Sequence, residues 1–147
     1  MRSSRFFVAF FLVCALSACA GVGKEVKVKS GTDCQQVAGS WQATEEIMPL
    51  DCPISNRTEQ YQYVIIQDGC KLTIKDVNRG VSYNGIIKDN IVSWKGNFRE
   101  EMGFVTLDEM ALTLGADRNS MGGYCAWTFR GPNDCTGKTR MTLKRVK

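Results

Sequence analysis

Three pairs of adjacent carboxylates are the residues whose type could perform catalysis, because two carboxyl groups can together hydrolyse a glycosidic bond. They are Glu45-Glu46, Glu100-Glu101 and Asp108-Glu109. Neighbouring residues on a strand point to opposite faces of a sheet, so none of these pairs can itself form a catalytic dyad. We therefore expect these carboxylates to be solvated at strand ends.

Other catalytic and cofactor chemistries are excluded by what the sequence lacks. The 147 residues include no histidine, which removes Ser-His-Asp hydrolysis and histidine-ligated zinc. A glycine-rich phosphate loop, a nucleophile elbow and metal-ligand spacing are also absent from the sequence. The sequence thus predicts a protein that is not an enzyme and binds no metal or cofactor, with a weak carboxylate-based hydrolase as the remaining catalytic alternative.

The amino-terminal residues are typical of an export signal. Arg2 and Arg5 precede an apolar run from Phe6 to Leu16, which is too short to span a bilayer. The sequence Leu16-Ser17-Ala18-Cys19 then resembles the lipobox of bacterial lipoprotein precursors. This resemblance implies that residues 1–18 are a signal peptide and that Cys19 becomes lipidated, although an ordinary secretory signal with a chance cysteine is the alternative.

Several acyl chains on Cys19 would anchor the protein firmly to a membrane. In the lipoproteins that this sequence resembles, an Asp after the lipidated Cys favours the inner membrane, whereas here that residue is Ala20. We therefore expect a lipid-anchored protein on the periplasmic face of the outer membrane, if the source is Gram-negative. Residues 19–33 are predicted to be the lipidated Cys and a linker, with a short strand at Val26–Val28 as the alternative, and residues 34–147 to be the folded domain.

The charge of the mature chain argues against nucleic acid as a partner. Without Arg2 and Arg5, the chain keeps 17 Lys and Arg against 15 Asp and Glu, a net charge of +2. The basic residues are scattered apart from two clusters, at residues 24–29 and 144–147. We interpret these clusters as solvated surface or as contacts with anionic headgroups.

From Cys34 onward, apolar residues recur with a period of two and turn signals are frequent, which predicts strands. Asp68-Gly69, Asn78-Arg79-Gly80 and Asp89-Asn90 predict tight turns. About nine strands are expected, of which the sixth and seventh can form one bulged element. They cover residues 39–44, 58–67, 70–75, 81–88, 91–96, 103–107, 110–114, 124–130 and 139–146.

Short connections between successive strands predict an all-β fold, an antiparallel up-and-down meander. Closing such a sheet into a barrel removes its exposed edges, and about eight strands enclose an interior that holds side chains or one small ligand. The fold class predicted is therefore a closed β-barrel of about eight strands.

The first strand also carries a family resemblance. Gly39-Ser40-Trp41 resembles the Gly-x-Trp signature of lipocalin-like and avidin-like barrels, the calycin group. The resemblance implies that the Trp41 indole closes one end of the barrel and that an Arg near the end of the last strand packs across it. Arg145 is the expected partner, with Arg140 as the second choice. The Thr-Asp-Tyr motif typical of lipocalins is absent.

Five cysteines of the expected domain are available for disulfides, which an oxidising periplasm favours. Two bridges and one free thiol allow 15 connectivities, but the barrel places Cys34 and Cys70 near the start of the first strand. Cys52 and Cys135 fall near the opposite end. A Cys52–Cys135 bridge is therefore expected first and a Cys34–Cys70 bridge second, and which cysteine stays free is left open.

Function is open between two main hypotheses. The barrel either binds a small apolar or amphipathic molecule in its lumen, or it is filled by its own side chains and acts as an interaction module for a periplasmic protein. The residues that bind a ligand are not predicted. Eight aromatic residues are candidates for core or cavity and are not separated by the sequence: Tyr61, Tyr63, Tyr83, Trp94, Phe104, Tyr124, Trp127 and Phe129.

Overall fold

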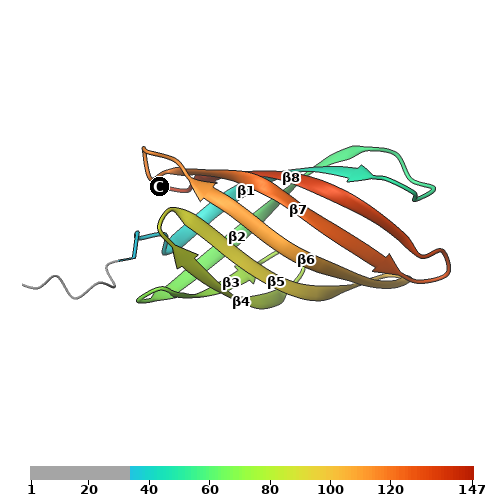
Figure 1. The fold of residues 1–147 in the computed structure, drawn as a ribbon, viewed down its shortest axis with the longest axis horizontal. Coiled ribbons are helices and arrows are strands. Elements are labelled where there is room, and N and C mark those ends of the chain that lie inside the picture. Colours follow the sequence, from blue (N-terminus) through green and yellow to red (C-terminus); the bar gives the residue numbers. More distant parts are fainter. Residues whose placement is uncertain (1–33) are drawn as a thin grey trace, which may run out of the picture.

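A computed structural model describes residues 34–147, which form a single all-β unit with eight strands in sequence order (Figure 1). Alternating residues of each strand are buried, so each strand has one face in the interior and one in solvent. The strands are β1 (Gly39–Pro49), β2 (Arg57–Asp68), β3 (Lys71–Asp76), β4 (Val81–Lys88), β5 (Ile91–Glu100), β6 (Gly103–Leu114), β7 (Ser120–Arg130) and β8 (Cys135–Arg145).

Every strand pairs antiparallel with its neighbours, and β8 pairs back onto β1, so the sheet closes. In the register of that last pair, Trp41 lies opposite Arg145 and Pro49 opposite Gly137. The predicted antiparallel barrel of eight strands is thereby confirmed. Within residues 34–147, no helix is long and apolar enough to cross a membrane.

Several strands are longer than the sequence predicts. The two candidate segments after Gly103 are one strand, β6, whose pairing with β7 shifts register between Leu107 and Glu109. This bulge turns Asp108 and Glu109 to solvent while Leu107 and Met110 both face the interior side. β5 extends beyond Gly96 to Glu100 and β8 begins at Cys135 rather than at residue 139.

One end of the barrel, where β1 begins, is closed by packed side chains. Trp41 is fully buried and its Nε1 donates a hydrogen bond to the carbonyl oxygen of Val37 at 2.9 Å. The guanidinium carbon of Arg145 lies 4.4 Å from the centroid of the Trp41 ring. The same guanidinium donates hydrogen bonds to the carbonyl oxygens of Ala38 and Gln36. Arg145 therefore covers the indole, as the Gly-x-Trp resemblance implies, and Arg140 instead pairs with Glu46 on the outer surface.

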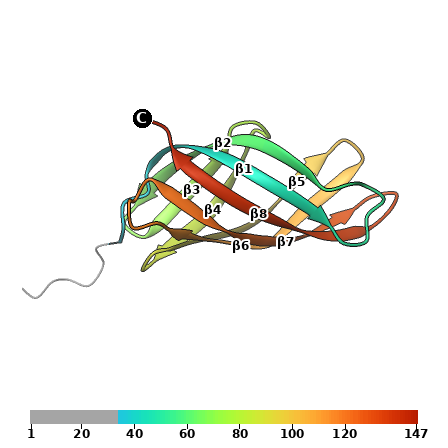
Figure 2. The same ribbon diagram turned by 90° about the horizontal axis from the view of Figure 1, so that it is seen from above.

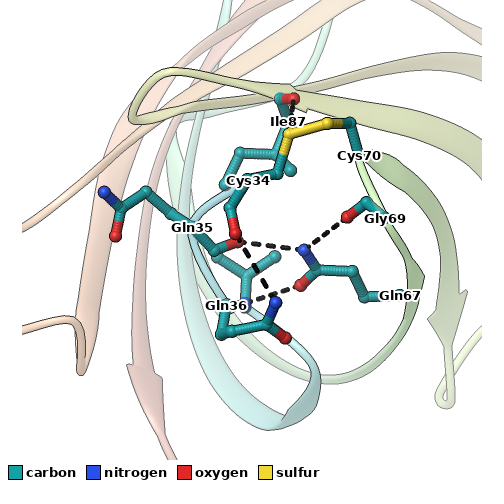
Figure 3. Close-up of a disulfide and its surroundings, with 8 residues drawn as sticks. Cys34, Gln35, Gln36, Gln67, Gly69, Cys70 and Ile87 are labelled. Atoms are coloured by element: carbon teal, nitrogen blue, oxygen red, sulfur yellow. Dashed lines mark hydrogen bonds between the residues drawn. A yellow bond between two sulfur atoms is a disulfide. The ribbon is translucent and has the colours of Figure 1, made fainter. Parts of the chain in front are cut away.

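The segment before β1 crosses this closed end and is held there from two sides. Cys34 is bonded to Cys70 at the start of β3, as Figure 3 shows. The Gln67 side chain accepts a hydrogen bond from the Val37 backbone at 2.8 Å and donates one to the Gln35 carbonyl oxygen at 3.0 Å (Figure 3). The backbone before Trp41 is thus fixed over the base of the barrel.

The second disulfide joins Cys52 in the β1–β2 connection to Cys135 at the start of β8. Both expected bridges are confirmed, and Cys125 is free and buried. Each bridge constrains the unfolded chain and contributes about 2–4 kcal/mol to stability in general. The two bridges lie at opposite ends of the barrel, so each pins a segment that strand pairing alone does not hold.

The predicted signal peptide, the predicted lipidation site Cys19 and the predicted linker lie in residues 1–33, outside the described residues. The domain boundary at residue 34 stays a prediction.

Candidate functional site

The barrel is packed in one half and hollow in the other. Large buried side chains fill the half near Trp41, among them Ile74, Ile87, Leu112 and Leu143. Toward the opposite end, the interior opens into a cavity of about 360 Å³. Its mouth lies where the β1–β2, β5–β6 and β7–β8 connections gather, away from the carboxyl terminus (Figures 1 and 2).

The cavity wall is mainly apolar. Residues of six strands form it, and a second, smaller packed cluster around Trp127 and Ile47 supports it. Gly137 on β8 faces Trp127 on β7, and a Cβ at this glycine would collide with the indole ring. The glycine therefore lets the indole lie against the wall instead of filling the lumen. The main wall residues are Ile47, Tyr63, Phe98, Val105, Leu107, Met110, Trp127 and Phe129.

A difference in strand length opens the barrel wall on one side of this cavity. β3 has 6 residues and β4 has 8, whereas β2 has 12. Residues 57–62 of β2 therefore pair with β1 but not with β3, and residues 96–100 of β5 pair with β6 but not with β4. The β3–β4 turn docks on β2 in this gap, with the Val77 backbone donating to the Gln62 carbonyl oxygen at 2.9 Å.

Arg79, in that turn, fills the gap. Its guanidinium carbon lies 3.8 Å from the Tyr61 ring centroid and 4.4 Å from the Phe98 ring centroid. Rings from β2 and β5 thus both contact one cation, an arrangement that stabilises a desolvated guanidinium. The side chain is 15% exposed and lines the cavity.

Two buried carboxylates meet the edge of the same guanidinium. Asp76, whose side chain is fully buried, accepts a hydrogen bond from Arg79 Nη1 at 2.8 Å and another from the Arg79 backbone at 3.0 Å. Glu45 on β1 lies farther away, with Oε2 3.4 Å from Arg79 Nη2. Its Oε1 accepts a hydrogen bond from the Tyr63 hydroxyl at 2.7 Å.

The electrostatics of this cluster follow from its burial. Burial raises the pKa of Glu45 above its ordinary value of 4.5, and Arg79 and the Tyr63 hydroxyl only partly oppose this rise. Burial also raises the pKa of Tyr63, and the negative charge of Glu45 adds to that effect. Burial acts to lower the pKa of Arg79, but Glu45 and Asp76 outweigh it and raise this pKa. Arg79 is therefore a permanent cation, whereas burial disfavours the ionised form of Glu45.

The expectation that the acid pairs are solvated is wrong for Glu45, which is 4% exposed. Glu46, its neighbour, faces solvent and pairs with Arg140 at 2.6 Å. The two residues point to opposite faces, as expected, so they form no dyad. Glu45 shares the inward face of β1 with Trp41, Ala43 and Ile47, and this alternation is the sequence signal that identifies it. Arg79 gives no such signal, because it lies in a turn.

The structure also separates the eight aromatic candidates. Phe104 and Tyr124 are 53% and 59% exposed, so they belong to neither core nor cavity. Tyr63, Trp127 and Phe129 line the cavity, and Tyr61 covers Arg79. The two remaining aromatics, Tyr83 and Trp94, are buried, and among the described residues their hydroxyl and indole N–H have no hydrogen-bond partner.

Two further features near the cavity carry no chemistry. Asp51 lies close to the sulfurs of Cys52 and Cys135, but these form a disulfide and offer no thiolate to a metal ion. Burial raises the pKa of the free Cys125 thiol to about 12, which leaves it protonated and unreactive at neutral pH.

No protein-family model matches the chain, and comparison with curated proteins gives no significant match.

Proposed function

We propose that this protein is a lipid-anchored, non-enzymatic envelope protein whose barrel binds a small apolar or amphipathic molecule. The observation that supports binding is the cavity of about 360 Å³. Ligand sites in proteins are concave, largely apolar and about 300–1,000 Å³ in volume, with few polar groups. The cavity has this character, since its wall is mainly aliphatic and aromatic and its charged groups are confined to the Glu45–Arg79 cluster and the mouth.

A molecule retained during purification tests this binding function directly. We expect native mass spectrometry of the full chain, released from detergent micelles, to detect a small molecule bound to the protein. Val105→Trp should abolish this adduct, because Val105 lines the cavity and an indole there occupies its volume. Thr106→Trp is the matched control, since the adjacent side chain points to solvent and binding should be unchanged.

The proposal is contradicted if neither the wild-type chain nor the Thr106→Trp variant carries an adduct, or if Val105→Trp retains it. Circular dichroism melting of both variants distinguishes a filled cavity from a barrel that has failed to fold.

Membrane anchoring through Cys19 is the second part of the proposal and rests on the lipobox resemblance. We expect labelled palmitate to be incorporated into the wild-type chain and Cys19→Ala to abolish incorporation completely. Cys14→Ala is the matched control, because this cysteine lies within the predicted signal peptide. Equal labelling of wild type and Cys19→Ala would refute the anchor. Fractionation of inner and outer membranes then tests the proposed outer-membrane location.

The alternative function, an interaction module for a periplasmic protein, is favoured by one observation at the cavity mouth. Leu50, Ile54 and Met102, in the β1–β2 and β5–β6 connections, are 66%, 47% and 69% exposed. Exposed apolar side chains that gather at one site are typical of contact surfaces. Ile54 and Met102 also line the cavity, so a partner bound at the mouth would cover its entrance.

A further inference from the structure

We propose that the cavity selects amphiphiles with a cationic head, an alkylammonium group, over anionic or neutral ones of the same chain length. This inference rests on the proposed function and adds the charge class of the ligand. The ligand would place its ammonium against Glu45 and its alkyl chain along the apolar wall toward the mouth. Three arrangements of charge carry the inference: the ion pairing of Arg79, the unused hydrogen-bond acceptors of Glu45, and the carboxylates at the mouth.

Arg79 is the one cation in the interior among the residues described, and its side chain, which is 15% exposed, is already ion-paired. Its guanidinium carbon lies within 4.4 Å of the Tyr61 and Phe98 ring centroids, and Asp76 and Glu45 pair with its Nη1 and Nη2. A carboxylate or phosphate head entering the cavity would gain little from a guanidinium whose charge these two carboxylates already balance. It would instead lie beside Glu45, and like charges in a low-dielectric site repel strongly.

The Glu45 carboxylate, in contrast, can still accept further hydrogen bonds. An ionised carboxylate can accept about four hydrogen bonds. Glu45 accepts one short hydrogen bond, from Tyr63, and one long one, from Arg79 at 3.4 Å, while its side chain lines the cavity. An ammonium group has three donors and no acceptor, so it complements the remaining lone pairs of this carboxylate.

The carboxylates at the mouth of the cavity also favour a cationic ligand. Glu100 and Glu101 line the mouth together with Arg57. The Arg57 guanidinium forms an ion pair with Glu59. Glu59 and Asp76, which neutralise the two lining arginines, are themselves not part of the lining. The lining carboxylates Glu45, Glu100 and Glu101 are therefore left in excess. A cation is attracted at the entrance as well as at the base.

Three six-carbon compounds that differ only in the head group test this selectivity: hexylammonium, hexan-1-ol and hexanoate. The full chain in dodecyl maltoside micelles is titrated at about pH 8, with tryptophan emission as the signal because Trp127 lines the cavity. Protein-free micelles correct for partitioning. We expect hexylammonium to bind at least about tenfold more tightly than hexanoate, with hexan-1-ol between them, since a charge-assisted hydrogen bond is worth roughly a factor of ten.

Adjacent glutamates provide matched variants. Glu45→Gln keeps the shape of the side chain and its hydrogen bond from Tyr63, and we expect it to remove the preference for hexylammonium. Glu46→Gln removes a carboxylate from the outer face of the same strand and should leave the preference intact.

Equal affinity for the three compounds, tighter binding of hexanoate, or an unchanged preference in Glu45→Gln would overturn the charge selection while leaving ligand binding in place. Failure of all three to bind, with no adduct in the mass spectra, would overturn the binding function as well.

Discussion

Replacing Arg79 by methionine should destabilise the barrel by about 3–5 kcal/mol, because it leaves buried carboxylates without their counter-ion. Asp76 loses its hydrogen bond from Arg79 Nη1, and Glu45 loses its nearest positive charge. The Tyr61 and Phe98 rings also lose the planar group that fills the gap between β2 and β5. Urea unfolding at neutral pH, followed by circular dichroism, measures the difference.

The loss of unfolding free energy in Arg79→Met should grow as the pH rises from acid to neutral. Burial already raises the pKa of Glu45 above 4.5, and Arg79 opposes this rise, so its removal raises the pKa further. A carboxyl group with a raised pKa in the folded state binds protons more tightly there than in the unfolded chain. Its contribution to stability is therefore present below pH 4.5 and is lost as the pH rises through the folded-state pKa. We therefore expect the difference in unfolding free energy between wild type and Arg79→Met to be smallest in acid and largest at neutral pH.

Arg57→Met is the matched control, since Arg57 also pairs with a glutamate at the same side of the barrel but is 46% exposed. Exposed ion pairs contribute about 0–1 kcal/mol, so this variant should unfold almost as the wild type does. A loss of stability in Arg79→Met no greater than in Arg57→Met, or one that does not change with pH, would contradict the role assigned to the buried cluster.

The fold is predictable from the sequence because most strands have one buried and one exposed face. That alternation, with tight turns such as Asp68-Gly69, determines both the strands and their antiparallel order. The alternation of apolar and polar residues is lost at the strand ends near the mouth of the cavity. Residues 97–100 and 135–138 look irregular in the sequence because charged or small residues line the cavity there. Glu100 lines the mouth, and Gly137 leaves room for the Trp127 ring.

The site is only partly predictable, for a similar reason. Glu45 follows the inward alternation of β1, so its burial is encoded locally, although a carboxylate in that position contradicts the usual preference of charged residues for solvent. Its partner Arg79 comes from a turn that reaches the interior because β3 and β4 are short. Such a contact depends on the relative lengths of strands distant in sequence, and no local pattern reports it.

Trp41→Ala should cost about 3–5 kcal/mol, as is usual when a fully buried tryptophan is truncated. The loss combines the burial of the indole, its hydrogen bond to the Val37 carbonyl oxygen, and the support that it gives to Arg145. Trp41→Phe keeps most of the ring volume and removes the N–H, so it should lose clearly less stability, about 1–2 kcal/mol.

Trp127→Ala is the control for Trp41→Ala, because its ring already borders the cavity and its removal leaves fewer broken contacts. Urea unfolding with both disulfides intact ranks the three variants. If Trp41→Ala were no more destabilising than Trp127→Ala, the closed end would not be the part of the barrel on which its stability depends. The expected order, with the greatest loss at Trp41, follows from a barrel that is packed at its base so that it can remain hollow at its mouth.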